Sequence, residues 1–319
     1  MLLRALSLVL LLALAACAQD PDFAGACGLR LRAEVPVMVR NNQPFVGLDI
    51  GGKRGVFLLD TGALSITMTH RGARRLGVEA LGGFYDIAGI GGTSVGGSAR
   101  LSGASLAGIA LPEQTVTLLA DTSIAGTGGA DGILGIRDLA RYEWDMDLPA
   151  GRIGLYAGTP CRDERRPVPA GMVDVRASWT SRPALEQQDP RSHLRLRLDG
   201  RETVAVIDTG AQSSFLFRHA AASVGVGEAE LARAPTIRTR GFGPAPVASP
   251  VWRFAAVEIG GRVLRDVPMN VVEINDTNFV TFYEVGLGLG MDYLGRHRVW
   301  LAHASRMVLV PGHVGGGVP

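Results

Sequence analysis

The chain has 319 residues and a formal net charge of +2, with 47% hydrophobic residues, 19% charged residues and 43 glycines. This length suits two lobes that each bury a core, and the composition favours a sheet-rich, turn-rich globule over a helical bundle or a disordered chain. The basic residues are spread along the chain and aromatic residues are few, which excludes the basic stripe and stacking platform of a nucleic-acid-binding protein.

The N-terminus is typical of an exported protein. Arg4 precedes a short apolar run at 8–14, which predicts a signal peptide over residues 1–16. The residues that end at Cys17 resemble the lipobox of bacterial lipoproteins, which implies lipidation of Cys17 and a membrane anchor. The alternative is ordinary cleavage after Ala18. Lipidation implies a protein on the periplasmic side of the cell envelope, and Ala18 after the cysteine favours the outer membrane.

Two further cysteines bracket the first half of the chain, Cys27 before it and Cys161 after it. In an exported chain such a pair is permitted a disulfide, which would join the two ends of the first lobe. A thiol nucleophile or a metal pair is the alternative, but neither cysteine lies in a reactive motif. The six histidines show no ligand spacing either, so we expect no metal site and no cofactor.

In chain order, the pattern predicts a lipidated tether at 17–35, a first lobe at 36–158, a linker at 159–192, a second lobe at 193–311 and a flexible tail at 312–319. The linker is marked by a shift toward Pro, Arg, Asp, Glu and Gln, with one strand near 172–175. Alternating apolar residues predict strands at 45–50, 56–59, 64–68, 104–110, 114–120, 152–156, 193–198, 204–207, 254–259, 267–272, 299–301 and 307–310. Short helices are expected at 71–76, at 219–224 and from residue 137.

The strand at 56–59 ends in Asp60-Thr61-Gly62-Ala63, and 148 residues later (208 − 60) the strand at 204–207 ends in Asp208-Thr209-Gly210-Ala211. Each copy is followed by a glycine-rich tip and an apolar-Gly segment in the same order, which indicates an internal duplication and two pseudo-symmetric lobes. A carboxylate at the end of a buried strand costs several kcal/mol if it is charged and unpaired. Two such carboxylates in matching sequence contexts indicate a common role, and we expect the side chains of Asp60 and Asp208 to lie in contact.

Two carboxylates within hydrogen-bond reach share one proton, so that one acts as an acid and the other as a base. The ionised member can take a proton from water while the neutral member polarises a carbonyl, which hydrolyses an amide without a covalent intermediate. Threonine hydroxyls could lock the two turns together, and glycines let backbone N–H groups approach the carboxylates. These supporting residues are Thr61, Gly62, Thr209 and Gly210.

These motifs resemble the aspartic protease superfamily, both the retroviral-type proteases and the single-chain, two-lobed pepsin-like enzymes. The resemblance covers nearly all of residues 37–310 and includes the two catalytic turns, a retroviral-like flap tip at Gly89-Ile90-Gly91-Gly92, and the segment Ile133-Leu134-Gly135 with Arg137-Asp138-Leu139. It implies an all-β fold of two six-stranded-type lobes with a cleft between them and a few short helices. It also implies an aspartic endopeptidase that works as a monomer, because Asp60 and Asp208 form the catalytic dyad within one chain.

The resemblance further implies flaps that hold an extended peptide substrate by strand-like pairing. We expect one flap tip at Gly89, Ile90 and Gly91 and another at Gly241, Phe242 and Gly243, with side-chain pockets lined by Ile90, Phe242, Phe215 and Leu216. The second flap is short and stiffened by Pro244, which predicts that it is vestigial. The segment Gly288-Leu289-Gly290 departs from the bulky apolar pair of the family. Tyr85 could be a flap tyrosine or a strand tyrosine that faces solvent.

Ala63 and Ala211 end the two turns, where pepsin-like enzymes usually carry a hydroxyl residue. Losing that hydroxyl removes a hydrogen bond to the charged carboxylate and should raise the lower pKa of the dyad. We therefore expect a working range nearer neutral pH than that of pepsin. Export points to envelope proteins or the periplasmic parts of membrane proteins as substrates.

Three alternatives to an active protease follow from the same residues. The glycine turns at 49–52 and 208–213 also resemble phosphate loops of actin-like sugar kinases, although export separates the protein from ATP. A protease fold without its chemistry could be a lipoprotein that only binds peptides or a partner protein in its cleft. The carboxylates could also be structural, each capping its own turn, but this does not explain the duplication.

Overall fold

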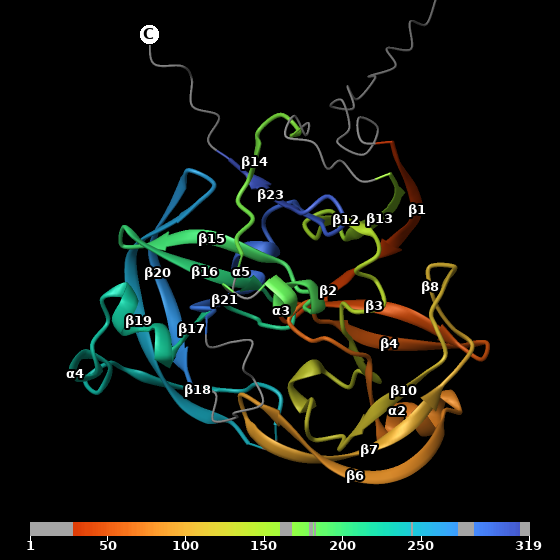
Figure 1. Ribbon diagram of the computed structural model, residues 1–319. Helices are drawn as coiled ribbons and strands as arrows, with labels where there is room; N and C mark the ends of the chain where they lie inside the picture. Colours follow the sequence, from red (N-terminus) through yellow and green to blue (C-terminus); the bar gives the residue numbers. More distant parts are fainter. Residues whose placement is uncertain are drawn as a thin grey trace, which may run out of the picture.

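The computed structural model describes residues 28–159, 168–178, 181, 183–243, 245–273 and 284–312. Its regular structure is mostly β, and Figure 1 shows two lobes side by side, the first in orange and yellow and the second in green and blue. The expected all-β, two-lobed fold is confirmed. Among the described residues no helix is long and apolar enough to span a membrane. The expectations for the signal peptide, Cys17, Cys27, Cys161 and the tail from residue 313 lie outside the described residues.

The first lobe is one large sheet that surrounds the first Asp-Thr-Gly turn. Its central strands alternate as the sequence predicts, with Leu48, Phe57 and Leu59 buried in the core. The strand order is β6-β7-β10-β5-β11-β4-β3-β8-β9, with β2 paired to β3. The strands are β2 (Met38–Arg40), β3 (Gln43–Ile50), β4 (Lys53–Leu59), β5 (Thr67–Thr69), β6 (Glu79–Gly89), β7 (Gly92–Leu101), β8 (Ala104–Leu106), β9 (Ile109–Ala110), β10 (Gln114–Leu119) and β11 (Gly132–Leu134), and a 3₁₀ turn, η1 (Ala125–Thr127), precedes β11.

Helix α2 (His70–Leu76) contacts this sheet and begins one residue before the expected position. Thr69 caps it, because its hydroxyl accepts a hydrogen bond from Gly72 N at 2.9 Å. Gly77 ends the helix in a left-handed conformation (φ 76°), which residues with a Cβ rarely adopt. Local sequence signals therefore determine both ends of this helix.

Of the two other expected helices, the one from residue 137 is wrong and the one at 219–224 is helical but of the 3₁₀ type. From residue 137 the chain makes turns instead, with Leu139 N bonded to Ile136 O at 3.0 Å, because strand β12 (Glu143–Asp147) follows at once. At 219–224 two 3₁₀ turns, η2 (Arg218–Ala220) and η3 (Ala222–Val224), replace the helix. Gly225 ends them with φ 86°, and such a short segment closes with i→i+3 hydrogen bonds.

The second lobe repeats the first with fewer strands, in the order β15-β16-β21-β17-β20-β19-β18, and β15 also pairs with β19. The register is conserved between the lobes: Phe45 pairs with Leu58 and His193 with Val206, and both offsets (193 − 45 and 206 − 58) equal 148. The strands are β15 (His193–Leu198), β16 (Arg201–Ile207), β17 (Phe215–Phe217), β18 (Thr236–Thr239), β19 (Val247–Ile259), β20 (Arg262–Val272) and β21 (Leu287–Leu289), and the helices are α4 (Glu228–Leu231) and α5 (Met291–Leu294).

A third sheet joins the two lobes, and the sequence does not predict it. It runs β1-β13-β12-β22-β23-β14 and takes strands from both halves of the chain, in the upper part of Figure 1. At its centre β12 pairs with β22, and Trp144 and Trp300 are among the largest fully buried side chains. The other strands are β1 (Leu29–Pro36), β13 (Arg152–Gly158), β14 (Met172–Asp174), β22 (Val299–Ala302) and β23 (Met307–Pro311).

The joining sheet revises the expected boundaries. The tether expected at 17–35 becomes strand β1 from Leu29 on, and the linker expected at 159–192 contributes β14 and carries helix α3 (Pro183–Gln188). Strands β22 and β23, expected in the second lobe, pair with the joining sheet, while the lobe sheets themselves have ten and seven strands. Because the ends of both halves pair with each other, the lobes are held in one arrangement.

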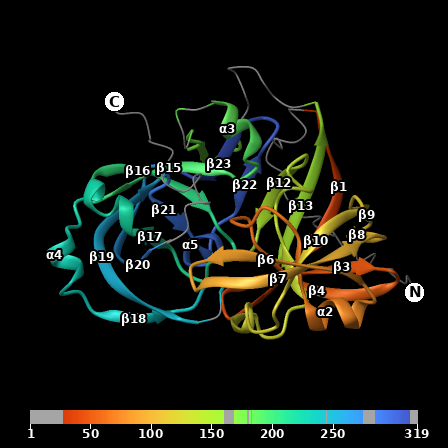
Figure 2. The ribbon, with the colours of Figure 1, turned by 60° about the horizontal axis from the view of Figure 1, so that its bottom comes forward.

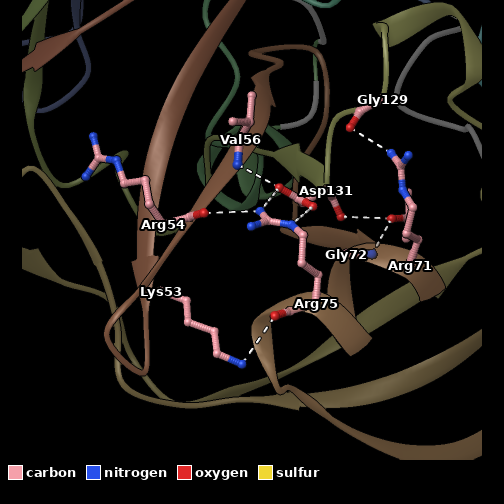
Figure 3. A network of polar contacts seen from close by, with 9 residues as sticks. Lys53, Arg54, Val56, Arg71, Gly72, Arg75, Gly129 and Asp131 are labelled. Atoms are coloured by element: carbon pink, nitrogen blue, oxygen red, sulfur yellow. Dashed lines mark hydrogen bonds and ion pairs between the residues drawn. The ribbon is translucent and has the colours of Figure 1, made fainter.

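Asp131 anchors α2 to the sheet of the first lobe (Figure 3). Its buried carboxylate accepts from Arg75 Nε at 2.9 Å and from Arg75 Nη2, and also from Val56 N at 2.8 Å. Its main-chain carbonyl accepts from Thr69, the residue that caps α2. Strand pairing places Gly286 at the equivalent position of the second lobe, so this carboxylate anchor is confined to the first lobe.

Replacing Asp131 by alanine should lower the free energy of unfolding by about 1–3 kcal/mol, because the partly buried Val56 N–H loses its acceptor and Arg75 loses its partner. Chemical denaturation followed by circular dichroism measures this change. The control is Asp49→Ala, which breaks the exposed Arg54–Asp49 pair of the same sheet and should cost about 0.5 kcal/mol or less. Equal costs for the two substitutions would contradict the anchoring role of Asp131.

Candidate active site

Each Asp-Thr-Gly turn follows a central strand of its lobe and lies over an apolar-Gly segment. In the first lobe β4 runs parallel to β11, and Asp60 N donates to Leu134 O at 3.0 Å. In the second lobe β16 runs parallel to β21, and Asp208 N donates to Leu289 O at 3.0 Å. The duplicated sequence therefore builds the same support beneath both aspartates.

The two threonines interlock across the lobes. Thr61 Oγ1 donates to Ile207 O and Thr209 Oγ1 donates to Leu59 O, both at 2.7 Å. Each hydroxyl also accepts the backbone N–H of the other threonine at 3.1 Å. Both threonines are 0% exposed, so these hydrogen bonds are shielded from water. The interlock fixes the separation of the two turns, as expected for residues that support a dyad.

A glycine follows each threonine because the opposite carboxylate approaches it closely. A Cβ at Gly62 would lie 2.7 Å from Asp208 Cγ, and a Cβ at Gly210 would lie 2.4 Å from Asp60 Cγ. Real Cβ atoms essentially never approach other atoms so closely. The two aspartates therefore meet, each packed against the turn of the other lobe.

Backbone N–H groups of its own turn hold each carboxylate. Asp60 Oδ1 accepts from Gly62 N and Ala63 N, both at 2.9 Å. The corresponding bonds to Asp208 Oδ1 come from Gly210 N at 2.9 Å and Ala211 N at 3.2 Å. Alanine supplies no hydroxyl at either position, so the turns stabilise the ionised carboxylates through backbone dipoles.

The surroundings give the two carboxyl groups different proton affinities. Burial and the charge of Asp60 raise the pKa of Asp208 well above its usual range. Burial also raises the pKa of Asp60, but hydrogen bonds from Ala63, Asp208 and Gly62 and the charge of Arg191 oppose the rise. In a coupled pair of this kind the two carboxyl groups share one proton.

The β6–β7 hairpin forms the first flap, and its tip reaches the second lobe (Figure 2). Gly91 N donates to Phe242 O at 2.8 Å. The tips pack so closely that a Cβ at Gly241 would lie 2.7 Å from Ile90 Cβ. All six expected flap residues belong to the segments that meet here, Gly89-Ile90-Gly91 and Gly241-Phe242-Gly243. Phe242 thus holds the tip of the β6–β7 hairpin, while Pro244, on which the expectation of a stiff second flap rested, lies outside the described residues.

An apolar cluster borders the Asp-Thr-Gly turn of each lobe, since Ala63 and Ala211, which end these turns, pack against it. In the first lobe the cluster includes Phe45 and Leu119, and Phe242 from the second-lobe tip packs against it. In the second lobe the cluster includes Phe215, and Ile90 from the first flap packs against it. Each cluster is therefore completed by the flap tip of the opposite lobe.

One expected pocket residue is wrong. Leu216 is fully buried in the main core, whereas its neighbours Phe215 and Phe217 lie in the cluster beside the second turn. Side chains alternate along β17, so Phe217 shares a face with Phe215 and Leu216 points the other way. The alternation of side chains along this strand is the sequence signal that identifies Phe217, together with Phe215, as a residue of the cluster beside the second turn.

Phe215 explains why position 288 carries glycine and not the bulky apolar residue that the family pattern leads us to expect. A Cβ at this glycine would lie 2.4 Å from Phe215 Cε1, so the aromatic ring fills the space.

The two interpretations of Tyr85 depend on its side chain, which lies outside the described part of the structure. In that described part, no group of three or more His, Cys, Asp or Glu residues is placed to hold a metal ion.

A family model described as aspartyl protease matches residues 46–137 and 194–293, which gives one match in each lobe and one Asp-Thr-Gly turn in each match. The chain belongs to the aspartyl protease family. Its glycine turns are therefore those of an aspartyl protease, and the sugar-kinase alternative is wrong.

A solved structure shares the fold of this aspartyl protease. The crystal structure of the aspartic proteinase from Irpex lacteus is similar to it with a TM-score of 0.53 and 12% sequence identity, covering 88% of this chain and 97% of that one. At this identity the likeness shows the fold alone. No curated protein matches the sequence.

Proposed function

We propose that this aspartyl protease is an endopeptidase that hydrolyses peptide bonds with a water molecule activated between Asp60 and Asp208. The observation that carries the proposal is the pair of buried carboxyl groups, which interlocked threonines hold together and whose pKa values are both raised. Membership of the family and the shared fold support a hydrolase. Both aspartates are therefore assigned as catalytic residues.

The reaction starts with the shared proton on Asp208 and with Asp60 ionised. Ionised Asp60 takes a proton from water as the water oxygen attacks the substrate carbonyl carbon, and neutral Asp208 gives its proton to the carbonyl oxygen. In the resulting gem-diol, Asp60 carries a proton and Asp208 is ionised. Asp60 then protonates the leaving nitrogen, and a diol hydroxyl returns a proton to Asp208 as the C–N bond breaks. The dyad ends as it began, and no acyl-enzyme forms.

We further propose that the substrate is an extended peptide with apolar residues on both sides of the cleaved bond. The β6–β7 hairpin offers backbone for strand-like pairing, and an apolar cluster borders each catalytic turn. The hydrogen bond from Gly91 N to Phe242 O must open before a peptide reaches the dyad. The assignment of a monomer rests on the dyad being formed within one chain.

The place of action is proposed from the N-terminal sequence. A signal peptide over 1–16 and a lipobox-like Cys17 support export and a lipid anchor on the periplasmic side of the envelope, in the outer membrane. Envelope proteins are then the accessible substrates. Radiolabelled fatty acid incorporated into the wild-type chain, and absent after Cys17→Ala, is the expected result for lipidation.

The test of the proposed activity is incubation of the purified protein with a peptide library, followed by identification of new termini by mass spectrometry. We expect cleavage between apolar residues, and none above background with Asp208→Asn as the matched control. If the wild-type protein binds peptides in the cleft and leaves them intact, the proposal is overturned. The function is then that of a catalytically inactive lipoprotein that binds peptides or a partner protein.

The pH profile of kcat/KM should be bell-shaped, with its maximum displaced toward neutral pH. Activity needs ionised Asp60 and protonated Asp208, so it falls below the pKa of Asp60 and above the pKa of Asp208. Both pKa values are raised above that of an ordinary aspartate, which moves both limbs to higher pH. Initial rates on one peptide over a series of buffers measure the profile. A maximum below about pH 3 would contradict the expectation.

A further inference from the structure

A cavity of about 860 Å³ lies where the chain enters the second lobe. Its walls come from the end of α3, the start of β15, the turn between β22 and β23, and the turns after β11. The volume falls in the range of roughly 300–1,000 Å³ that small ligands occupy. None of the residues that line it belongs to the catalytic turns, so the cavity is separate from the dyad.

The walls of this cavity are strongly basic. Among the described residues that line it, four are arginines and one, Asp189, is acidic. Asp189 is already paired with Arg191 through two hydrogen bonds of 2.9 and 2.7 Å, and both side chains are only 3% exposed. The described lining residues therefore carry three more positive than negative charges (4 − 1). The arginines are Arg137, Arg176, Arg191 and Arg306.

Other hydrogen-bond donors lie among the basic residues. His303 lines the cavity, with Nδ1 3.5 Å from Ser192 Oγ, and its Nε2 is buried with no hydrogen-bond partner in the described structure. Burial lowers the pKa of His303 to about 4, so the ring is neutral near pH 7. In the tautomer that accepts from Ser192, Nε2 carries a hydrogen and lacks an acceptor. Buried donors without an acceptor are rare in folded proteins, so this ring adds an unsatisfied polar group to a wall that is already basic.

The duplication places different residues at one pair of equivalent positions near the two Asp-Thr-Gly turns. Arg191 precedes Asp208 by 17 residues, and Gln43 precedes Asp60 by the same 17 (208 − 191 and 60 − 43). Gln43 crosses to the opposite lobe, where its Nε2 lies 3.3 Å from Gly210 O in the second catalytic turn. Arg191 is the equivalent residue of the second lobe by sequence, its guanidinium pairs with Asp189, and its charge opposes the rise in the pKa of Asp60. A neutral amide is thus replaced by a guanidinium at this position.

We infer that this cavity is an anion-binding site separate from the dyad and that it takes carboxylate groups. Guanidinium groups fit carboxylates because their N–H donors form a planar fork that binds two oxygens at once. The carboxylates have two sources, an acidic residue of the peptide substrate or a free polycarboxylate. The first source rests on the proposed function, whereas the second does not.

Direct binding tests the site without any turnover. Isothermal titration calorimetry uses the full chain carrying Asp208→Asn and three probes: citrate, a peptide with one glutamate, and the same peptide with glutamine. The double substitution Arg176→Gln and Arg306→Gln should weaken binding of citrate or of the glutamate peptide by about tenfold or more. Arg137→Gln, a milder change at the same wall, should weaken it less. The matched control is Arg253→Gln, which removes one exposed arginine from its pair with Asp266 on β19–β20.

The outcomes separate the two sources. Preference for the glutamate peptide over the glutamine peptide, lost in the double variant, identifies a substrate carboxylate. Saturable citrate binding with the same loss identifies a free anion. If neither probe distinguishes the double variant from the control, the site is overturned. Because binding is the readout, failure of this inference and failure of peptide hydrolysis are recorded separately.

Discussion

Asp208→Asn should lower kcat for peptide hydrolysis by about 10³–10⁴-fold, because an amide cannot give a proton to the substrate carbonyl and take it back. Asp60→Asn should do the same, since an amide cannot accept the proton of the attacking water. KM should change far less, because neither substitution touches the apolar clusters or the flap tips. Progress curves on a single peptide, with enzyme concentration raised for the variants, measure both constants.

The same substitutions should leave the fold intact. The pKa values of both carboxyl groups are raised in the folded protein, so their contribution to stability is present at low pH and is lost as pH rises through the folded pKa values. At neutral pH an amide removes that penalty, so Asp208→Asn should unfold at the same or a higher denaturant concentration. The matched control is Asp266→Asn, at a side chain that is 74% exposed, which should leave kcat unchanged. An active Asp208→Asn variant would mean that the carboxylates are structural.

The dyad itself could be predicted from the sequence because its signal is local and repeated. The sequence contains two strands that each end in Asp-Thr-Gly, and this repetition predicts that the two turns lie next to each other. The structure shows why each residue type is needed: Thr61 and Thr209 exchange hydrogen bonds, and Gly62 leaves room for the Asp208 carboxylate. Helix α2 was equally predictable, since Thr69 and Gly77 mark its two ends.

The joining sheet could not be predicted in this way. Its strands alternate like any other strands, and its pairings, such as Trp144 with Leu301, join segments far apart in the sequence. No local signal says which strand a given strand will meet. The lining of the basic cavity was missed for a related reason, because its arginines are scattered between residues 137 and 306. Comparing equivalent positions of the two halves would have singled out Arg191 against Gln43.

Thr61→Val should destabilise the protein by about 3 kcal/mol and lower kcat about tenfold to a hundredfold. Valine keeps the shape of threonine but removes the hydroxyl that donates to Ile207 O at 2.7 Å and accepts from Thr209 N at 3.1 Å. Both partners are then buried without a hydrogen bond, and the second turn is free to shift relative to the first. Denaturant unfolding and kcat on one peptide measure the two effects.

Thr61→Ser separates the hydroxyl from the methyl group, because serine keeps both hydrogen bonds and loses only the packed carbon, at about 1 kcal/mol. Thr209→Val should match Thr61→Val, since each threonine makes its own pair of bonds and the two pairs are related by the duplication. If the four bonds act as one unit, the double valine variant will cost less than the sum of the single variants. Equal stability of Thr61→Val and Thr61→Ser would instead show that packing, and not hydrogen bonding, sets the distance between the two aspartates.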